Sequence, residues 1–257
     1  MPDKRTTSRR PWERDELLLA LSLYFQTRFG RLHRTNPDIV ELATTLGRTP
    51  SAVAMKASNF ASLDPRLAAR GVVGLQGASR ADRAIWAEAR PNMTWLAVES
   101  ELAQARITRL NDQQKPRSTP TGPTETQVVR NERRVQSFFR AAVLATYDDK
   151  CAVTGMSVPA LLNASHIIPW SIDEERRADP SNGIALNVLH DRAFDRGFIT
   201  FDQPLKLIVS SALRNSSATN FQQSSLLDYE GSQLSIPDRN PPDEEALRYH
   251  RETVFIE

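Results

Sequence analysis

The sequence predicts an α+β protein, with a mainly helical N-terminal domain at residues 1–110 and a C-terminal domain at residues 129–257. Three observations predict this class. Apolar residues recur at helical spacing through the first part of the chain. A stretch at 111–128 is rich in Pro, Thr, Ser and Gly and poor in apolar residues, which is typical of a linker. Beyond it, short apolar runs typical of strands alternate with helical patterns.

The N-terminal domain opens with three expected helices, at 12–29, 36–47 and 50–62. The first carries a stripe of leucines and aromatic residues. Asn36-Pro37 and Thr49-Pro50 each place a capping side chain before a proline, which fits the first helical position. Short helices joined by tight turns indicate a helix-turn-helix or winged-helix-like module.

In such a module the third helix would be the recognition helix, and its polar side chains Ser51, Lys56 and Asn59 would contact DNA. The other interpretation is a helical scaffold that packs on the C-terminal domain. The Gly-containing stretch 64–78 is expected to be a loop or wing. Further helices are expected at 79–90 and 93–109, with apolar residues that belong to the core.

The C-terminal domain should begin with a strongly amphipathic helix from about residue 131. A strand is then expected at 164–169, a polar loop at 171–181, and a turn at Asn182-Gly183. Ile184, Leu186 and Val188 favour a mostly buried second strand, and residues 190–196 a short helix that ends at Gly197. Two more strands are expected at 198–202 and 205–210.

Three polar residues stand in a fixed order on this strand, loop, strand and helix pattern: His166, Asn182 and His190. Their flanks are equally distinctive, with Cys151-Ala-Val-Thr-Gly before them and His-Asp-Arg-Ala-Phe-Asp-Arg-Gly from His190 onward. Together these features resemble the HNH nucleases, also called the ββα-metal group, in the branch of bacterial restriction-type endonucleases. The resemblance covers roughly residues 130–215, and residues 12–75 resemble the helical region that accompanies such domains.

The resemblance implies a role for each of these residues in phosphodiester hydrolysis. His166 would be the general base, since a neutral imidazole accepts a proton near neutral pH. Asn182 would brace the hairpin loop or contribute near the metal. His190 would be a ligand, carried on the helix, of one divalent metal per active site, with Mg²⁺ favoured and Mn²⁺ left open.

One position departs from the family pattern. Many members carry Asp immediately before the base, where it also holds the metal, but this chain has Ser165. We therefore take Asp191 as the second metal ligand, with Asp195 as another candidate. Each of these residues also has an ordinary structural interpretation, as a core histidine, a turn residue or a surface carboxylate.

Composition limits the remaining alternatives. The only cysteine is Cys151, so no disulfide within the chain and no four-cysteine structural zinc is expected. No apolar run is long enough for a membrane span and no secretory signal is visible, so we expect a cytoplasmic protein. The net charge is only +2, but arginines concentrate near the N-terminus and around residues 130–140, which suits contacts with phosphates.

These observations lead to a hypothesis of function. The chain is expected to be a metal-dependent restriction endonuclease that cuts double-stranded DNA, with a preference for modified cytosine left open. Cutting both strands favours a homodimer. The alternatives are a DNA-binding regulator whose nuclease domain has lost activity, and a toxin-like or RNA-directed nuclease.

Overall fold

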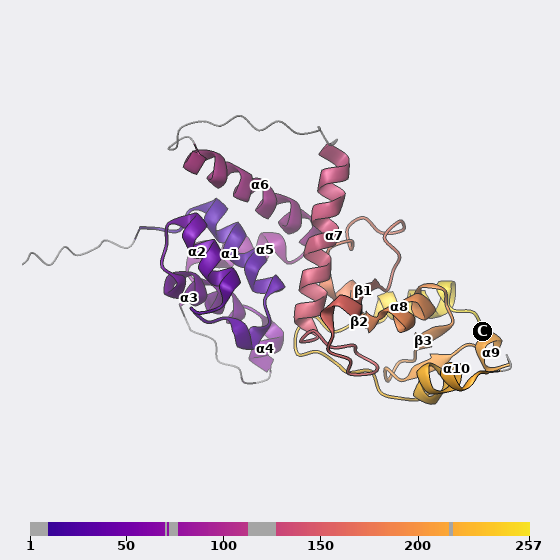
Figure 1. Ribbon diagram of the computed structural model, residues 1–257. Helices are drawn as coiled ribbons and strands as arrows, with labels where there is room; N and C mark the ends of the chain where they lie inside the picture. Colours follow the sequence, from indigo (N-terminus) through magenta and orange to yellow (C-terminus); the bar gives the residue numbers. More distant parts are fainter. Residues whose placement is uncertain (1–9, 70, 72–76, 113–126, 216–217) are drawn as a thin grey trace, which may run out of the picture.

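The computed structural model describes residues 10–69, 71, 77–112, 127–215 and 218–257. Helices form the N-terminal part, and two small antiparallel sheets with short helices form the C-terminal part (Figure 1). The N-terminal helices are α1 Arg14–Gln26, α2 Pro37–Leu46, α3 Pro50–Ala61, α4 Pro65–Ala69, α5 Arg80–Ala89 and α6 Met93–Asp112, with a 3₁₀ turn η1 at Phe29–Arg31.

The predicted caps of α2 and α3 are confirmed. The Asn36 side chain accepts a hydrogen bond from the Asp38 backbone N–H, and Thr49 accepts one from Ala52. Gly47 ends α2 in the left-handed region with φ of 59°, where glycine has no steric penalty. Local sequence thus sets where these helices start and stop.

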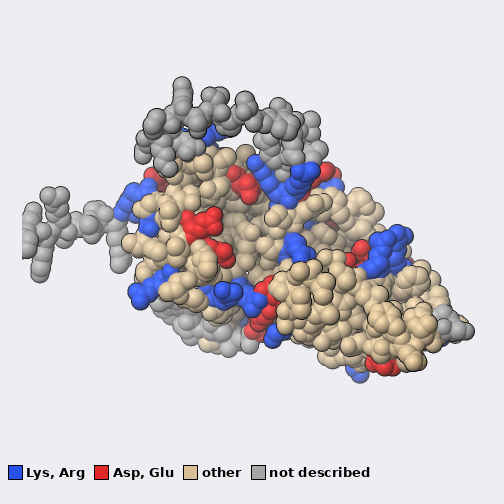
Figure 2. Space-filling view, in the orientation of Figure 1, with Lys and Arg blue, Asp and Glu red and all other residues tan. Residues whose placement is uncertain are grey.

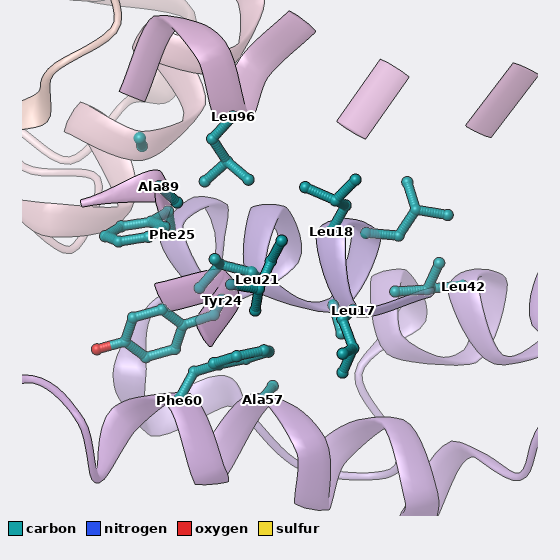
Figure 3. Packing of buried hydrophobic residues seen from close by; sticks show 14 of the residues in the cluster. Leu17, Leu18, Leu21, Tyr24, Phe25, Leu42, Ala57, Phe60, Ala89 and Leu96 are labelled. Carbon is teal, nitrogen blue, oxygen red and sulfur yellow. The ribbon is translucent and has the colours of Figure 1, made fainter. Parts of the chain in front are cut away.

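The core of the N-terminal part surrounds α1. In Figure 3, Leu17, Leu18 and Leu21 of α1 lie between α3, which contributes Ala57 and Phe60, and side chains of α5 and α6. Almost the whole circumference of α1 is buried. A helix enclosed in this way serves as the central element of a helical bundle.

Two expectations for this region need correction or stay open. Residues 65–69, expected to be loop or wing, form the short helix α4, and no strand occurs among the described residues 10–112, so a winged-helix domain is not confirmed. Of the predicted linker, residues 113–126 lie outside the described residues. Asn111 and Asp112 end α6, while Gln127 begins α7.

Helix α7, Gln127–Thr146, lies between the two parts and packs on both of them (Figure 1). Val135, Phe138 and Ala142 belong to the N-terminal core, whereas Phe139 and Val143 belong to the C-terminal core. The same helix therefore fixes the position of the C-terminal hairpin relative to the N-terminal bundle.

The C-terminal hairpin pairs β1, Leu162–His166, with β2, Gly183–Asn187, in antiparallel register, so that His166 lies opposite Gly183. Helix α8, Val188–Asp195, follows directly. It begins two residues earlier than predicted because Asn187 caps it, accepting hydrogen bonds from the N–H groups of Leu189 and His190. Every residue of β2 is buried, since α7 and α8 both pack against the hairpin.

The rest of the chain completes the C-terminal core. The second sheet pairs β3, Ile199–Phe201, with β4, Leu207–Val209, close to the predicted strands. Short helices follow: α9 Ser211–Arg214, α10 Asn220–Ser225, the 3₁₀ turn η4 Leu227–Tyr229, and α11 Glu244–Tyr249, which continues into a π-helical turn η5 at His250–Val254. Gly197 ends α8 with φ of 71°, as predicted.

A second connection joins the C-terminal segment to the N-terminal bundle. The buried Arg239 guanidinium donates hydrogen bonds to the backbone oxygens of Tyr24 at 3.2 Å and Thr27 at 2.8 Å, at the end of α1. These carbonyls lack partners within the helix, and a positive charge is stabilised near the C-terminal end of a helix by the helix dipole. Arg239 thus holds residues far apart in sequence together.

Gly183 leaves no room for a side chain between the hairpin and α7. A Cβ atom there would lie 2.5 Å from Val143 Cγ2 and 2.8 Å from Phe139 Cζ, both on α7. We predict that Gly183→Ala lowers the free energy of unfolding by about 1–3 kcal/mol, because the added methyl overpacks this contact. Chemical denaturation measures the change.

Gly30→Ala is the matched control, since a Cβ at Gly30 meets nothing within 4 Å. Its unfolding free energy should stay within about 0.5 kcal/mol of the parent. Equal stability of both variants would show that α7 does not approach the hairpin this closely.

Candidate active site

A cleft of about 670 Å³ opens where α7, β1 and α8 meet. Its walls come from one face of α7, the end of β1 with the residues that follow it, and the exposed side of α8. The residues are Gln136, Phe139, Arg140, Asn163, Ala164, Ser165, His166, Pro169, Trp170, Ser171, Asp191, Arg192, Asp195 and Arg196. This set combines an imidazole, two carboxylates and several guanidinium groups, which is a composition suited to acid–base chemistry on an anion.

His166 is held in this cleft from three sides. Its ring stacks on Phe139 with centroids 3.7 Å apart, and the Trp170 ring meets its edge at 5.6 Å. Its Nε2 lies 3.0 Å from the backbone oxygen of Arg177. A carbonyl can only accept, so Nε2 carries the hydrogen and donates it, which leaves Nδ1 with a free lone pair.

The environment keeps His166 neutral. Burial lowers the pKa of His166 below its ordinary value, and the Arg177 carbonyl and the charge of Asp191 only partly offset this. No hydrogen bond to Nδ1 is found within the described residues. The imidazole is therefore uncharged at neutral pH and able to accept a proton at Nδ1.

Two carboxylates from α8 lie in the same cleft, one helical turn apart. Asp191 accepts a hydrogen bond from Asn163 Nδ2 at 2.7 Å, which ties α8 to β1. Burial raises the pKa of Asp195, and the negative charge of Asp191 raises it further, against the opposing effect of Arg192 and Arg196. Two neighbouring carboxylates that repel each other favour a bound cation.

Ser165 has a buried hydroxyl for which the described residues supply no hydrogen-bond partner. Side chains alternate along a strand, so Ser165 shares with Asn163 the face of β1 that contacts α8. The Ser165 hydroxyl is enclosed, so the oxygen donors that line the cleft are the carboxylates of Asp191 and Asp195.

These donors fit Mg²⁺ or Mn²⁺ better than zinc. Within the part of the chain that the structure describes, no group of three or more His, Cys, Asp and Glu side chains is close enough to hold a metal. Mg²⁺ usually takes one or two carboxylates and fills its remaining positions with water and phosphate oxygens. Asp191 and Asp195 meet that requirement.

Asn182 lies outside the cleft lining and is almost fully buried. Its Oδ1 accepts a hydrogen bond from the Ile168 N–H at 2.8 Å, and its Nδ2 donates to the oxygens of Ile168 at 3.2 Å and Arg176 at 3.4 Å. Asn182 therefore braces the loop between the strands, which is the first of its two expected roles.

His190 lies in a different place from its predicted partner Asp191. It lines a separate cavity of about 400 Å³, where Tyr229 meets its ring at 5.2 Å and its Nδ1 lies 2.9 Å from Asn187 Nδ2. Burial lowers the pKa of His190 to about 4, and Nε2 finds no partner among the described residues. Successive helix residues differ by about 100° in direction, and only Asp191 turns to the cleft.

The three residues of α3 that were expected to contact DNA also lie in different environments, two of them buried and one exposed. Lys56 is buried, with its Nζ 2.7 Å from the fully buried Asp82 carboxylate and 5.0 Å from the centre of the Trp12 ring. Asn59 is buried and donates to the Gly77 oxygen. Neither side chain can reach a base edge, because both satisfy contacts inside the bundle. Ser51 alone of the three is exposed.

Other functional groups were absent from the sequence-based expectations. Asn163 could have been found, since it stands two residues before Ser165 on the same strand face. Arg192 and Arg196 line the cleft but look like ordinary surface charges in the sequence, whereas Arg140, which also lines it, belongs to the arginine-rich stretch expected to contact phosphates. Arg177 acts through its backbone oxygen, which no side-chain pattern reveals.

This geometry agrees with a comparison to protein families. Residues 151–202 match the family model of the HNH endonucleases. The match spans 52 of the 257 residues and includes β1, β2 and α8. It indicates a nuclease that acts on nucleic acid. A comparison with curated proteins finds no match. No described helix is both long and apolar enough to cross a membrane.

The buried Lys56–Asp82 pair gives a test of the bundle. We predict that Lys56→Ala lowers the free energy of unfolding by about 3–5 kcal/mol, because it leaves the Asp82 carboxylate buried without its cation. Thermal and denaturant unfolding measure this.

The control is Ser51→Ala on the same helix, which should change stability by less than about 0.5 kcal/mol. If Lys56→Ala instead kept its stability and weakened DNA binding, the side chain would be a DNA contact after all.

Proposed function

We propose that this protein is a metal-dependent endonuclease that hydrolyses phosphodiester bonds in double-stranded DNA. One observation carries the proposal: the His166 ring is fixed with Nε2 donating to the Arg177 oxygen, in a cleft that also holds Asp191 and Asp195. That arrangement places a proton acceptor and a pair of carboxylates in one cleft. The HNH match over the same elements supports it.

His166 acts as the general base in this proposal. Its Nδ1 takes a proton from a water molecule as that water's oxygen forms a bond to phosphorus, and the bond from phosphorus to the 3′-oxygen breaks. The leaving oxygen then takes a proton from solvent. Phe139 keeps the ring in the plane required, and the Arg177 carbonyl stabilises the imidazolium that forms.

The carboxylates of Asp191 and Asp195 are the proposed metal ligands, with Asp195 in the place first expected for His190. A divalent cation bound there supplies charge neutralisation on the scissile phosphate and on the leaving oxygen. Asn163 orients Asp191 through its 2.7 Å hydrogen bond.

The arginines of the cleft suit the phosphates on either side of the cut. Arg192 is exposed on α8, Arg196 is exposed directly after it, and Arg140 reaches the cleft from α7. On the face drawn in Figure 2, the basic side chains lie in separate groups with acidic side chains between them. Contacts between separate groups of basic side chains and the DNA phosphates position a duplex without reading its sequence.

Within this activity, we propose that the protein is a restriction endonuclease that works as a homodimer to cut both strands. Selectivity for DNA with modified cytosine is one version of this proposal. The support for this role is the likeness of the motif and its flanks to the restriction-type branch. Base readout must then use residues other than Lys56 and Asn59.

We predict that His166→Ala lowers the cleavage rate by at least about 100-fold, because it removes the proton acceptor. Plasmid nicking and linearisation with Mg²⁺ or Mn²⁺ measure it, on unmodified and cytosine-modified DNA and on an RNA transcript. His33→Ala is the control, since His33 is exposed and lies outside the cleft.

The substrates separate the alternatives. Cleavage of RNA alone would replace the proposal with an RNA nuclease. DNA binding without cleavage of any substrate by the parent protein would replace it with a regulator.

We also predict that Asp191→Asn and Asp195→Asn each weaken Mn²⁺ binding at least about tenfold, because each removes an anionic ligand. Calorimetric titration of the protein without DNA measures this independently of activity. Asp148→Asn is the matched control, an exposed aspartate whose positive φ asparagine tolerates. Unchanged affinity in both cleft variants would place the metal elsewhere.

A further inference from the structure

The loop between the two strands, residues 167–182, supplies the carbonyl that orients His166. Its hydrogen bonds to the rest of the protein concentrate on either side of Arg177. On one side, the Arg176 oxygen accepts from Asn182 Nδ2, at the end of the same loop. On the other side, the Ala178 N–H donates to Thr94 Oγ1 at 3.3 Å, and Thr94 belongs to α6 of the N-terminal bundle.

Thr94 makes more than one contact with this loop. Its hydroxyl also lies 3.2 Å from the Glu175 oxygen and 3.4 Å from the Glu174 oxygen, and can donate its hydrogen to either. One hydroxyl thus accepts from the loop and donates to it. The three contacts span the chain on both sides of Arg177.

Apolar packing places the loop against the same bundle. Ala178 is fully buried and forms part of the N-terminal core, and the partly buried Trp170 packs against that core. Trp170 also accepts a hydrogen bond at its backbone oxygen from Arg177 Nε, 2.9 Å away, and the guanidinium lies over its ring. The loop around Arg177, whose carbonyl orients His166, therefore packs against the N-terminal helical bundle.

The C-terminal segment holds the opposite flank of the loop. Arg176 forms an ion pair with Asp243 at 3.0 Å, and the Asp243 N–H donates to the Ser181 oxygen. These contacts fix Arg176 but not the peptide that follows Arg177. The N–H of the peptide that carries the Arg177 carbonyl, which is that of Ala178, donates to Thr94.

We propose that Thr94 is a positioning residue for the general base. Through the loop, its hydroxyl aims the Arg177 carbonyl at His166 Nε2 and so selects the tautomer with a free Nδ1. The N-terminal bundle thereby completes an active site whose other residues all come from α7 and the C-terminal part. A ligand that moved α6 relative to the hairpin would change the rate through this contact. This inference rests on the proposed function for its effect on catalysis, while the tautomer is measurable without it.

The first experiment uses the full chain with Thr94→Val, which keeps the shape of the side chain and removes the hydroxyl. Two-bond ¹H–¹⁵N correlation spectra report which ring nitrogen of His166 carries hydrogen. The chain has four histidines, and single His→Gln variants assign their signals. In the parent, His166 should be the Nε2–H tautomer; in Thr94→Val, a mixture of tautomers is expected.

The second experiment measures cleavage. Thr94→Val should lower kcat about tenfold with KM within about twofold, because a displaced base slows the chemical step more than it weakens binding. Thr94→Ser should restore both the rate and the tautomer. Thr108→Val is the control, an exposed threonine on the same helix that is away from the loop.

The outcomes separate this inference from the proposed function. If Thr94→Val keeps a pure Nε2–H tautomer, the inference is overturned, whatever the protein cleaves. Loss of the tautomer with rescue by Thr94→Ser supports it even if no nucleic acid is cut, in which case only the proposed function fails. If the melting temperature of Thr94→Val equals that of Thr108→Val, the effect of the substitution is local. A fall in kcat of Thr94→Val without any change of the His166 tautomer counts against the inference.

Discussion

The close approach of α7 to the β hairpin is the contact on which the rest of the site depends. Gly183 has no side chain, so Phe139 and Val143 occupy the space that a Cβ would need. The same Phe139 ring then lies flat against His166, the residue paired with Gly183 across the hairpin. The same side chain, Phe139, thus both fills the core next to Gly183 and orients the proposed base His166. Helix α7 carries that constraint to the N-terminal bundle, because its other face is part of the bundle core.

Much of the fold follows from local sequence, but the site follows only in part. Caps at Asn36 and Thr49 and the stop at Gly197 are set by a few neighbouring residues, and they form as expected. Asn187 looked like one residue of a strand, yet its side chain caps α8, and this changes the direction of every later side chain. His190 then turns toward Tyr229 while Asp191 turns toward β1.

The N-terminal prediction shows a second limit, which concerns polar residues on a helix. Lys56 and Asn59 stand on α3 among apolar residues, and sequence alone does not tell a buried polar contact from an exposed one. The partner of Lys56 is Asp82, on α5, and the partner of Asn59 is the Gly77 oxygen. Such pairings depend on tertiary contacts between distant segments, which no local pattern contains. The pattern around His166 predicted the HNH match because its order and flanks are specific, whereas single charged residues on a helix are common.

Three imidazoles are buried or partly buried, and their contacts show why only one of them suits a base. His250 stacks on Phe194 and has partners at both nitrogens, Thr200 Oγ1 and the Phe194 oxygen, so it has no free lone pair to offer. His190 has a nitrogen with no partner, but that atom is enclosed. His166 alone among them joins a hydrogen-bonded Nε2 to a place in the cleft beside two carboxylates. Burial lowers the pKa of all three. The difference between a structural and a reactive histidine therefore lies in whether one ring nitrogen keeps a free lone pair in the cleft. For His166 that nitrogen is Nδ1, because Nε2 donates to the Arg177 carbonyl of the loop.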